Sequence, residues 1–409
     1  MRRGFLTILG GGGLAQIATI AALPMLGRLY DPIDFGQLGA VMAVVSLAAV
    51  IVHGRYQMAL PTVSSQREAQ ALLTTSLLLV LTLSLPVVCI IALAMGRAPD
   101  ELSPLTFVGL AVLLTIFSAA LDCMAYWRSR QGRFTVSARN AVLRSVAVVV
   151  SQIILFAWAG WGLIAGAAFG ATVALAAAAW DWWRHDRIEF ARFAPSELWD
   201  VIKRHKHFPL FGVPQGWLAA LSWNGLPLVL VAYGETALAG QFWVAYRLLI
   251  APVTLFGSAY RQAALPALRD LDERSGKMMA LRHMAAIALP ALVVAAILFT
   301  FGENLFVAFL GQDWALGGRI AGWLALGVAA DAFKVPAICL MQARGLQKIV
   351  LAWEICVIIP RYAAVFAIVG FGASLDVFAA FAITGLALWA LLPLPWLLTR
   401  SREQEARTL

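Results

Sequence analysis

Long apolar stretches constrain the fold of this chain more than any other feature. Windows of about 20 mostly apolar residues are long enough to cross a bilayer as a helix. Such windows can be drawn at residues 5–27, 36–58, 71–95, 104–126, 140–159, 161–180, 208–232, 238–260, 282–302, 317–342, 348–370 and 375–399. The 409 residues are 61% hydrophobic and only 13% charged, too apolar for a water-soluble domain. The sequence therefore predicts an all-α integral membrane protein with twelve transmembrane helices.

The distribution of Lys and Arg predicts the orientation, because short loops rich in these residues stay in the cytoplasm. With the N terminus inside, 25 basic residues fall on the cytoplasmic side, and only Arg28, Arg97 and Arg319 fall outside. We expect a multi-pass protein of the cytoplasmic (inner) membrane with both termini in the cytoplasm. The net charge of +9 follows from this asymmetry, so nucleic acid is not an expected partner.

A phrase near the end of the second apolar stretch recurs in the second half of the chain. Residues 54–63 read GRYQMALPTV and residues 259–268 read AYRQAALPAL, with the Gln, Ala, Leu and Pro returning 205 positions later. At an offset of 204, Gly36 and its following Gln match Gly240 and its following Gln. These matches predict a duplication of six helices. Because six is even, the two copies are related by an axis along the membrane normal.

The longest polar segment inside the chain, residues 184–207, separates the two copies. We predict an N-terminal six-helix lobe over 1–183, a cytoplasmic amphipathic linker over 184–207 and a C-terminal six-helix lobe over 208–409. Within the linker, apolar residues with helical spacing from Leu198 to Ile202 stand beside basic ones. This pattern predicts a short helix, starting near Pro195, that lies on the anionic inner leaflet. A solvated linker is the alternative.

Neither the cysteines nor the glycine run predicts a chemical site. The four cysteines lie in apolar stretches without paired ligand spacing, so no disulfide framework, metal site or cofactor is expected. The GGGG at residues 10–13 lacks the strand before it and the Gly-Lys-Ser/Thr after it that a phosphate-binding loop needs.

Three segments carry a resemblance to a known family: LPMLGRLYDPIDFGQLGAV from residue 23, GRYQMALP from residue 54 and HFPLFGVPQGWLAALSWNGLPLVLV from residue 207. The chain resembles the polysaccharide-exporter (oligosaccharide flippase) family of the multidrug/oligosaccharidyl-lipid/polysaccharide (MOP) transporter superfamily. The resemblance implies a two-lobed, MATE-like transporter without enzymatic activity, whose central cavity is lined mainly by helices 1, 2, 7 and 8.

The resemblance also implies the substrate, an oligosaccharide joined through a diphosphate to a polyprenyl lipid. Such a transporter turns this lipid over from the inner to the outer leaflet for lipopolysaccharide or exopolysaccharide biosynthesis. Membrane lipids and other polysaccharide-assembly proteins are the further partners it implies. Coupling to a proton or sodium gradient would drive the transport.

Three basic residues lie deep within the apolar stretches: Arg247, Lys334 and Arg361. Arg247 lies roughly 15 Å into the eighth stretch at the usual helical rise. A guanidinium can hold phosphate oxygens through two parallel hydrogen bonds, so Arg247 is the first candidate for binding the diphosphate. The alternative is an ion pair that only holds the helices together. That alternative is preferred for Arg361 and for Glu354 on the same helix, which is peripheral in the family.

Other candidate residues follow from the repeat and from helical spacing. Arg55 and Arg261, at equivalent ends of the two copies, would flank a cytoplasmic entrance for the diphosphate, unless they only anchor the orientation. Asn224, three residues before a proline, is a polar and kink-prone point expected to face the cavity. Lys334 is a further substrate-binding candidate, and Asp331, one turn before it, is the candidate for ion coupling. A self-satisfied pair of the two is the alternative.

Two other functions remain open. A drug or metabolite cation-coupled antiporter of the same superfamily would be expected to carry acidic residues deep in the first half, where Asp122 is the only one near the middle of a stretch. A polysaccharide polymerase or ligase would normally present acids or histidines on a sizeable outer loop. The largest outer loop here holds only Glu303 and Asp313.

Overall fold

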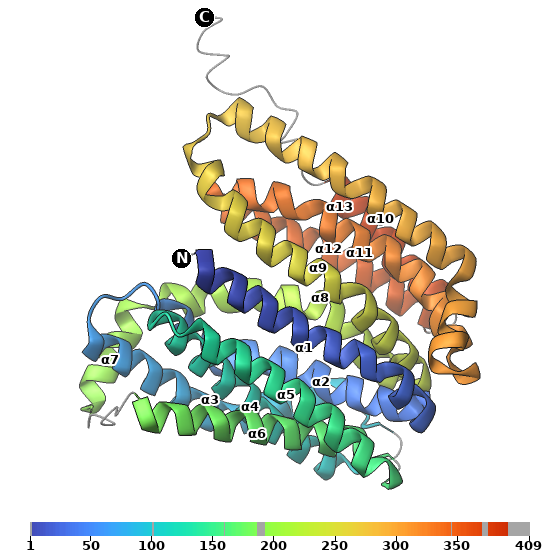
Figure 1. Ribbon diagram of the computed structural model, residues 1–409, viewed down its shortest axis with the longest axis horizontal. Helices are drawn as coiled ribbons and strands as arrows, with labels where there is room; N and C mark the ends of the chain where they lie inside the picture. The colour runs from blue at the N-terminus through green and yellow to red at the C-terminus, as the bar shows by residue number, and fades with distance from the viewer. Residues whose placement is uncertain are drawn as a thin grey trace, which may run out of the picture. The chain divides into compact units, whose positions relative to one another are not determined.

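A computed structural model describes residues 2–99, 102–158, 160–185, 193–344, 346–369 and 375–391. Within these ranges the chain is helical and has no strand (Figure 1). The α-helices are α1 (Arg2–Leu29), α2 (Pro32–Val52), α3 (Gln66–Met95), α4 (Pro104–Arg130), α5 (Phe134–Ile154), α6 (Gly162–His185), α7 (Pro195–Arg204), α8 (Val213–Ala232), α9 (Thr236–Asp270), α10 (Glu273–Leu310), α11 (Ala315–Ala343), α12 (Gln347–Val369) and α13 (Leu375–Leu391). Every predicted apolar stretch overlaps one long helix, and α7 lies in the predicted linker. The all-α membrane fold is confirmed.

Short helical turns of other pitch join some of these helices. They are η1 (Tyr56–Ala59), η2 (Leu155–Ala157), η3 (Phe208–Gly212) and η4 (Gln312–Trp314). Local sequence explains several helix ends. The side chains of Ser65 and Ser103 cap α3 and α4 by accepting hydrogen bonds from backbone N–H groups three residues on. Gly96 ends α3 in the left-handed conformation, with φ of 71°.

Among the described residues, ten helices are long and apolar enough to cross a membrane. Two helices run well past their predicted stretches, since α9 has 35 residues and α10 has 38. Hydropathy marks only the part of a helix that lies in lipid, so it misses polar ends that continue into water. The structure thus describes a multi-pass membrane protein, while the predicted orientation stays a prediction.

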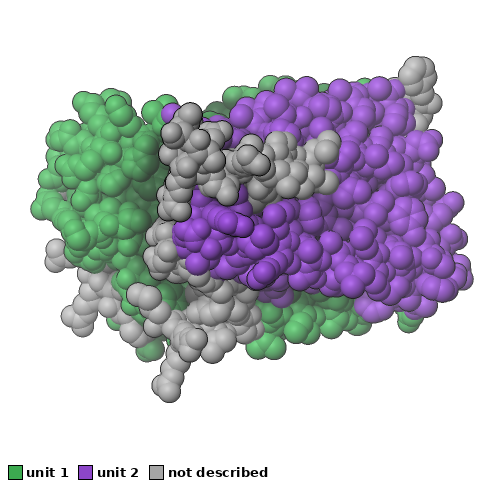
Figure 2. All heavy atoms as spheres, turned by 90° about the horizontal axis from the view of Figure 1, so that it is seen from above, with its two compact units in different colours: residues 1–243 green, residues 244–409 purple. Residues whose placement is uncertain are grey.

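The chain forms two compact units, Met1–Trp243 and Val244–Leu409, which Figure 2 colours green and purple. In the first unit α2 packs on α3, α4, α6 and α8, and α1 packs on α5. In the second, α10 packs on α11, and α13 packs on α11 and α12. The boundary lies within α9, not in the linker, so α8 is grouped with the N-terminal helices. The two predicted six-helix lobes stay a prediction.

Glycines bring α2 and the start of α9 into close contact within the first unit. A Cβ added to Gly36 would lie 2.8 Å from the backbone carbon of Thr236, and one added to Gly240 would lie 2.9 Å from that of Pro32. Gly240 stands 204 positions after Gly36, and Thr236 stands 204 positions after Pro32, so the two contacts are equivalent under the repeat. A two-fold repeat produces such reciprocal pairs of contacts. The structure therefore supports the offset of 204.

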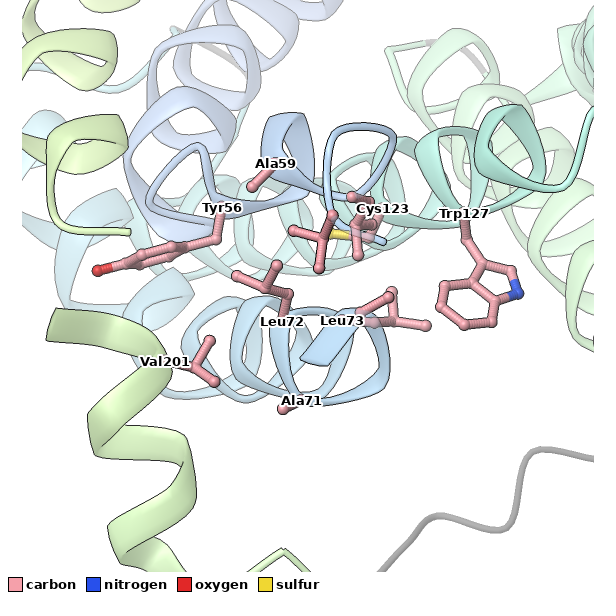
Figure 3. Close-up of a cluster of buried hydrophobic side chains, with 11 residues drawn as sticks. Tyr56, Ala59, Ala71, Leu72, Leu73, Cys123, Trp127 and Val201 are labelled. Carbon is pink, nitrogen blue, oxygen red and sulfur yellow. The ribbon is translucent and has the colours of Figure 1, made fainter. Parts of the chain in front are cut away.

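The predicted linker helix exists as α7, but its apolar side packs on protein. Val201 is 6% exposed and belongs to a cluster with Tyr56, Leu72 and Trp127, drawn in Figure 3. Two ion pairs between α3 and α7 add to this contact: Arg67–Glu197 at 2.7 Å and Arg204–Glu68 at 2.8 Å. The apolar face of α7 is therefore not free to enter lipid. Trp199, 56% exposed, is the large apolar side chain that it leaves uncovered.

Candidate functional site

The segment after α2 holds the most unusual backbone in the described part of the chain. Arg55 has φ of 59°, and no other described residue except glycine has a positive φ. Gly54 before it has φ of 55°, so two successive residues are left-handed and reverse the chain between α2 and η1. The imidazole Nδ1 of the buried His53 accepts a hydrogen bond from the Arg55 N–H at 3.3 Å. This turn fixes where the Arg55 side chain begins.

The guanidinium of Arg55 lies against the backbone of α8. A Cβ added to Gly216 would lie 2.5 Å from the Arg55 Cζ and 2.8 Å from Nε, so only glycine leaves room for this side chain. The side chain is half-buried, and its Nε is buried without a hydrogen-bond acceptor. Among the described residues, the side chain makes one hydrogen bond, which runs from Nη1 to the sulfur of Met58 at 3.5 Å. Arg55 forms no ion pair with any residue that the structure describes.

Of the two basic side chains in this turn, His53 and Arg55, only Arg55 is charged at neutral pH. Burial, reinforced by the charge of Arg55, lowers the pKa of His53 to about 3, so the imidazole stays neutral at neutral pH. Burial also lowers the pKa of Arg55, and Tyr126 and Asp122 oppose that shift. A guanidinium keeps its charge at physiological pH even so. Arg55 is therefore a permanent, incompletely solvated cation, which is a suitable partner for an anion.

Neighbouring arginines at the same end of the first unit bind groups of the protein itself. Arg133 pairs with Asp181 at 2.7 Å, and Arg128 pairs with the same carboxylate at 3.6 Å. Arg130 donates to the carbonyl oxygens of Leu60, Val63, Ser64 and Ser65 and so fixes the loop before α3. The structural contacts of these three arginines account for part of the excess of basic residues on the predicted cytoplasmic side, without a bound ligand.

Arg144 is a candidate that the sequence does not reveal, because it is one of the 25 basic residues assigned to the cytoplasmic side. α5 begins at Phe134, so Arg144 lies about 15 Å along the helix axis from its start. It is half-buried and donates from Nη2 to the Ser118 hydroxyl at 3.5 Å. The signal that could have found it is Gly132, whose φ of 70° ends the turn before α5.

A second polar group lies in the second unit, on α11 and α12. Asp331 is 8% exposed and pairs with Lys334, which their spacing of one turn allows. The carboxyl of Glu354 lies within electrostatic range of both and has one buried oxygen without a hydrogen-bond partner. Arg361 is 1% exposed, donates from Nε to the Phe381 carbonyl at 2.9 Å and lies 3.5 Å from the centre of its ring. The packing of Arg361 between α12 and α13 agrees with the structural role preferred for it.

The remaining predicted residues lie on α8 and α9. Arg247 is half-buried on α9, 11 positions after Thr236, and is engaged with neighbouring groups. The amide nitrogen of Asn224 donates to the Ala220 carbonyl one turn back at 2.9 Å. Arg261 lies on α9, but its side chain is outside the described residues. The predicted roles of these residues, including the entrance pair, stay predictions.

No described residues form a metal centre, since no group of three or more His, Cys, Asp or Glu side chains among them could hold a metal ion.

Comparisons with known proteins give one matching family and a set of similar folds. The model of a family described as polysaccharide biosynthesis protein matches residues 25–316. No curated protein matches. Among solved structures, an inward-facing multidrug-resistance MATE transporter of the MOP superfamily is similar at a TM-score of 0.59 and 17% identity, over 95% of this chain and 93% of that one.

Two further solved structures give the same result. An outward-facing MATE transporter of the MOP superfamily is similar at a TM-score of 0.60 and 15% identity, over 97% of this chain and 96% of that one. The eukaryotic MATE transporter AtDTX14 is similar at a TM-score of 0.54 and 15% identity, over 99% and 96%. At these identities the likeness shows the fold, which is that of a MATE-like transporter.

Proposed function

The chain belongs to the polysaccharide biosynthesis protein family, and from this premise we propose that it is a flippase for a polyprenyl-diphosphate-linked oligosaccharide. It turns this lipid from the inner to the outer leaflet of the cytoplasmic membrane, by alternating access, for cell-surface polysaccharide biosynthesis. The observation that carries the proposal is Arg55, a half-buried cation that Gly216 accommodates and that no described residue neutralises by an ion pair.

The chemistry of the substrate fits such a cation. A diphosphate needs cationic partners where water can reach, while its prenyl chain can stay in lipid. The fork of a guanidinium binds two phosphate oxygens at once, which the compact ammonium of lysine does not do. Arg55 and Arg261 would meet the diphosphate at the cytoplasmic side, and Arg247, Asn224 and Lys334 would meet it at greater depth.

Asp331 is the proposed coupling residue for a proton or sodium gradient. Its carboxylate is buried and pairs with Lys334, and a buried carboxylate of this kind can change partners when it binds an ion. Glu354 lies within electrostatic range of both residues.

Mass spectrometry of lipid-linked sugars tests the proposal and identifies the sugar. Cells that lack the protein should accumulate the diphosphate-linked oligosaccharide in the inner leaflet, and Arg55→Ala should restore export far less than the parent does. Arg67→Ala is the matched control, because Arg67 is a 70%-exposed arginine whose partner is Glu197. Unchanged lipid-linked sugars in cells lacking the protein would refute the flippase function.

A cation-coupled drug or metabolite antiporter is the second candidate, because the similar solved structures include multidrug transporters. That function predicts a different phenotype. Cells lacking the protein would become sensitive to cationic compounds while their lipid-linked sugars stayed normal. If the protein were a polymerase or ligase, cells lacking it would accumulate the lipid-linked oligosaccharide in the outer leaflet instead.

A further inference from the structure

One face of α4 carries a row of polar side chains in a mainly apolar helix. Ser118, Asp122 and Tyr126 follow one another at intervals of four residues, so they lie on the same side of the helix. Arg144 of α5 donates to the Ser118 hydroxyl at 3.5 Å. Arg55 lies within electrostatic range of Asp122 and Tyr126. This face of α4 therefore lies between two arginines from different elements.

The charges on this face are close to one another but are not paired. Asp122 is within electrostatic range of both Arg55 and Arg144, yet no ion pair joins it to either of them or to any other described residue. Asp181 on α6 shows the opposite arrangement, since it is 4% exposed and pairs directly with two arginines. Asp122 is exposed, although the protein surrounds it on several sides.

We propose that Arg55, Arg144 and Asp122 form one diphosphate-binding site, in which the two arginines hold the phosphate groups and Asp122 competes with phosphate for them. This inference rests on the proposed function. It adds Arg144 as a second phosphate-binding residue and gives Asp122 the role of limiting affinity.

The charge balance explains why a carboxylate is useful here. Two guanidinium groups and one carboxylate leave a single net positive charge, less than a diphosphate needs for neutralisation. The carboxylate lowers the attraction for the diphosphate, because like charges near a protein surface repel over several ångströms. A transporter must bind its substrate and also release it. Asp122 therefore sets an affinity that still allows the lipid to leave.

Binding of short-chain lipid phosphates to the purified full-length protein tests this site separately from transport. Farnesyl diphosphate and farnesyl monophosphate are the probes, and isothermal titration calorimetry is the measurement. The parent should prefer the diphosphate. Arg144→Ala should weaken diphosphate binding about tenfold or more, as expected for lost hydrogen bonds to a charged group. Asp122→Asn should instead tighten it by about three- to tenfold.

Two matched controls and a conservative variant accompany these changes. Arg139→Ala removes an exposed arginine from the same helix α5, and Asp200→Asn removes an exposed carboxylate from α7, so both should bind like the parent. Arg144→Lys keeps a cation at this depth if the alanine variant does not fold. It should lose affinity for the diphosphate more than for the monophosphate.

The possible outcomes separate the two proposals. A parent protein that binds neither probe would contradict the proposed function itself. A parent that prefers the diphosphate, with Arg144 variants that bind equally well or an Asp122→Asn variant that binds more weakly, would overturn the inferred site and leave the flippase function standing.

Discussion

Replacing Gly216 by alanine should impair transport while leaving the protein as stable as before. The added Cβ would lie 2.5 Å from the Arg55 Cζ and closer still to Nη2. Contact between such atoms is comfortable at about 3.5 Å, so the guanidinium has to move by roughly 1–2 Å. The atoms that must move form the end of a flexible side chain, and backbone is not involved. The substitution therefore displaces Arg55 without removing it.

The expected magnitudes have opposite signs for stability and for function. Alanine is better than glycine inside a helix by about 0.5–1 kcal/mol, so the folded state should be unchanged or slightly more stable. A displaced guanidinium loses hydrogen bonds to a charged ligand worth about 1.5–3 kcal/mol. At about 1.4 kcal/mol per factor of ten, binding of the diphosphate should weaken roughly ten- to hundredfold.

Two measurements on the same preparation of Gly216→Ala test whether transport falls while stability is kept. Thermal unfolding in detergent reports stability, and transfer of the diphosphate lipid across reconstituted vesicles reports function. Gly109→Ala is the matched control, because a Cβ at this glycine of α4 would meet nothing within 4 Å. Full transport by Gly216→Ala would show that the position of Arg55 does not matter, and a parallel loss of folding would show that Gly216 is only structural.

Three further predictions follow from other parts of the molecule. The pKa of His53 is about 3 in the folded protein and about 6.5 in the unfolded chain, so protonation of the unfolded chain lowers the free energy of unfolding as the pH falls below 6.5. This loss amounts to roughly 2 kcal/mol at pH 5. In His53→Gln, the free energy of unfolding should depend less on pH between 7.5 and 5. Gly36→Ala and Gly240→Ala each push a Cβ against backbone, so each should lower stability by about 1–3 kcal/mol, and clearly unequal losses would contradict the reciprocal crossing of α2 and α9. Asp331→Asn should abolish the dependence of transport on the ion gradient in vesicles, and an unchanged dependence would exclude Asp331 as the coupling residue.

Hydropathy and charge were sufficient to predict the helices, because each span buries one long apolar surface in lipid regardless of its neighbours. The same rules failed for Arg144, since a basic residue near the edge of an apolar window reads as cytoplasmic until the start of α5 is known. The role of Gly216 could not be predicted either. A glycine in an apolar helix can serve close packing, bending or nothing, and only its contact with Arg55, 161 positions earlier, decides between these.

The basic residues at the predicted cytoplasmic end serve two purposes that sequence alone does not separate. Orientation in the membrane requires only that positive charge is present there, and it is indifferent to what the charge touches. Arg130 and Arg133 satisfy that requirement while their guanidinium groups are held by loop carbonyls and by Asp181. Arg55 satisfies it as well, but Arg55 and the deeper Arg144 both face Asp122, a carboxylate that neither of them touches. Even a half-buried charge without a direct partner costs stability, and the proposed binding of a diphosphate would account for that cost where helix packing does not.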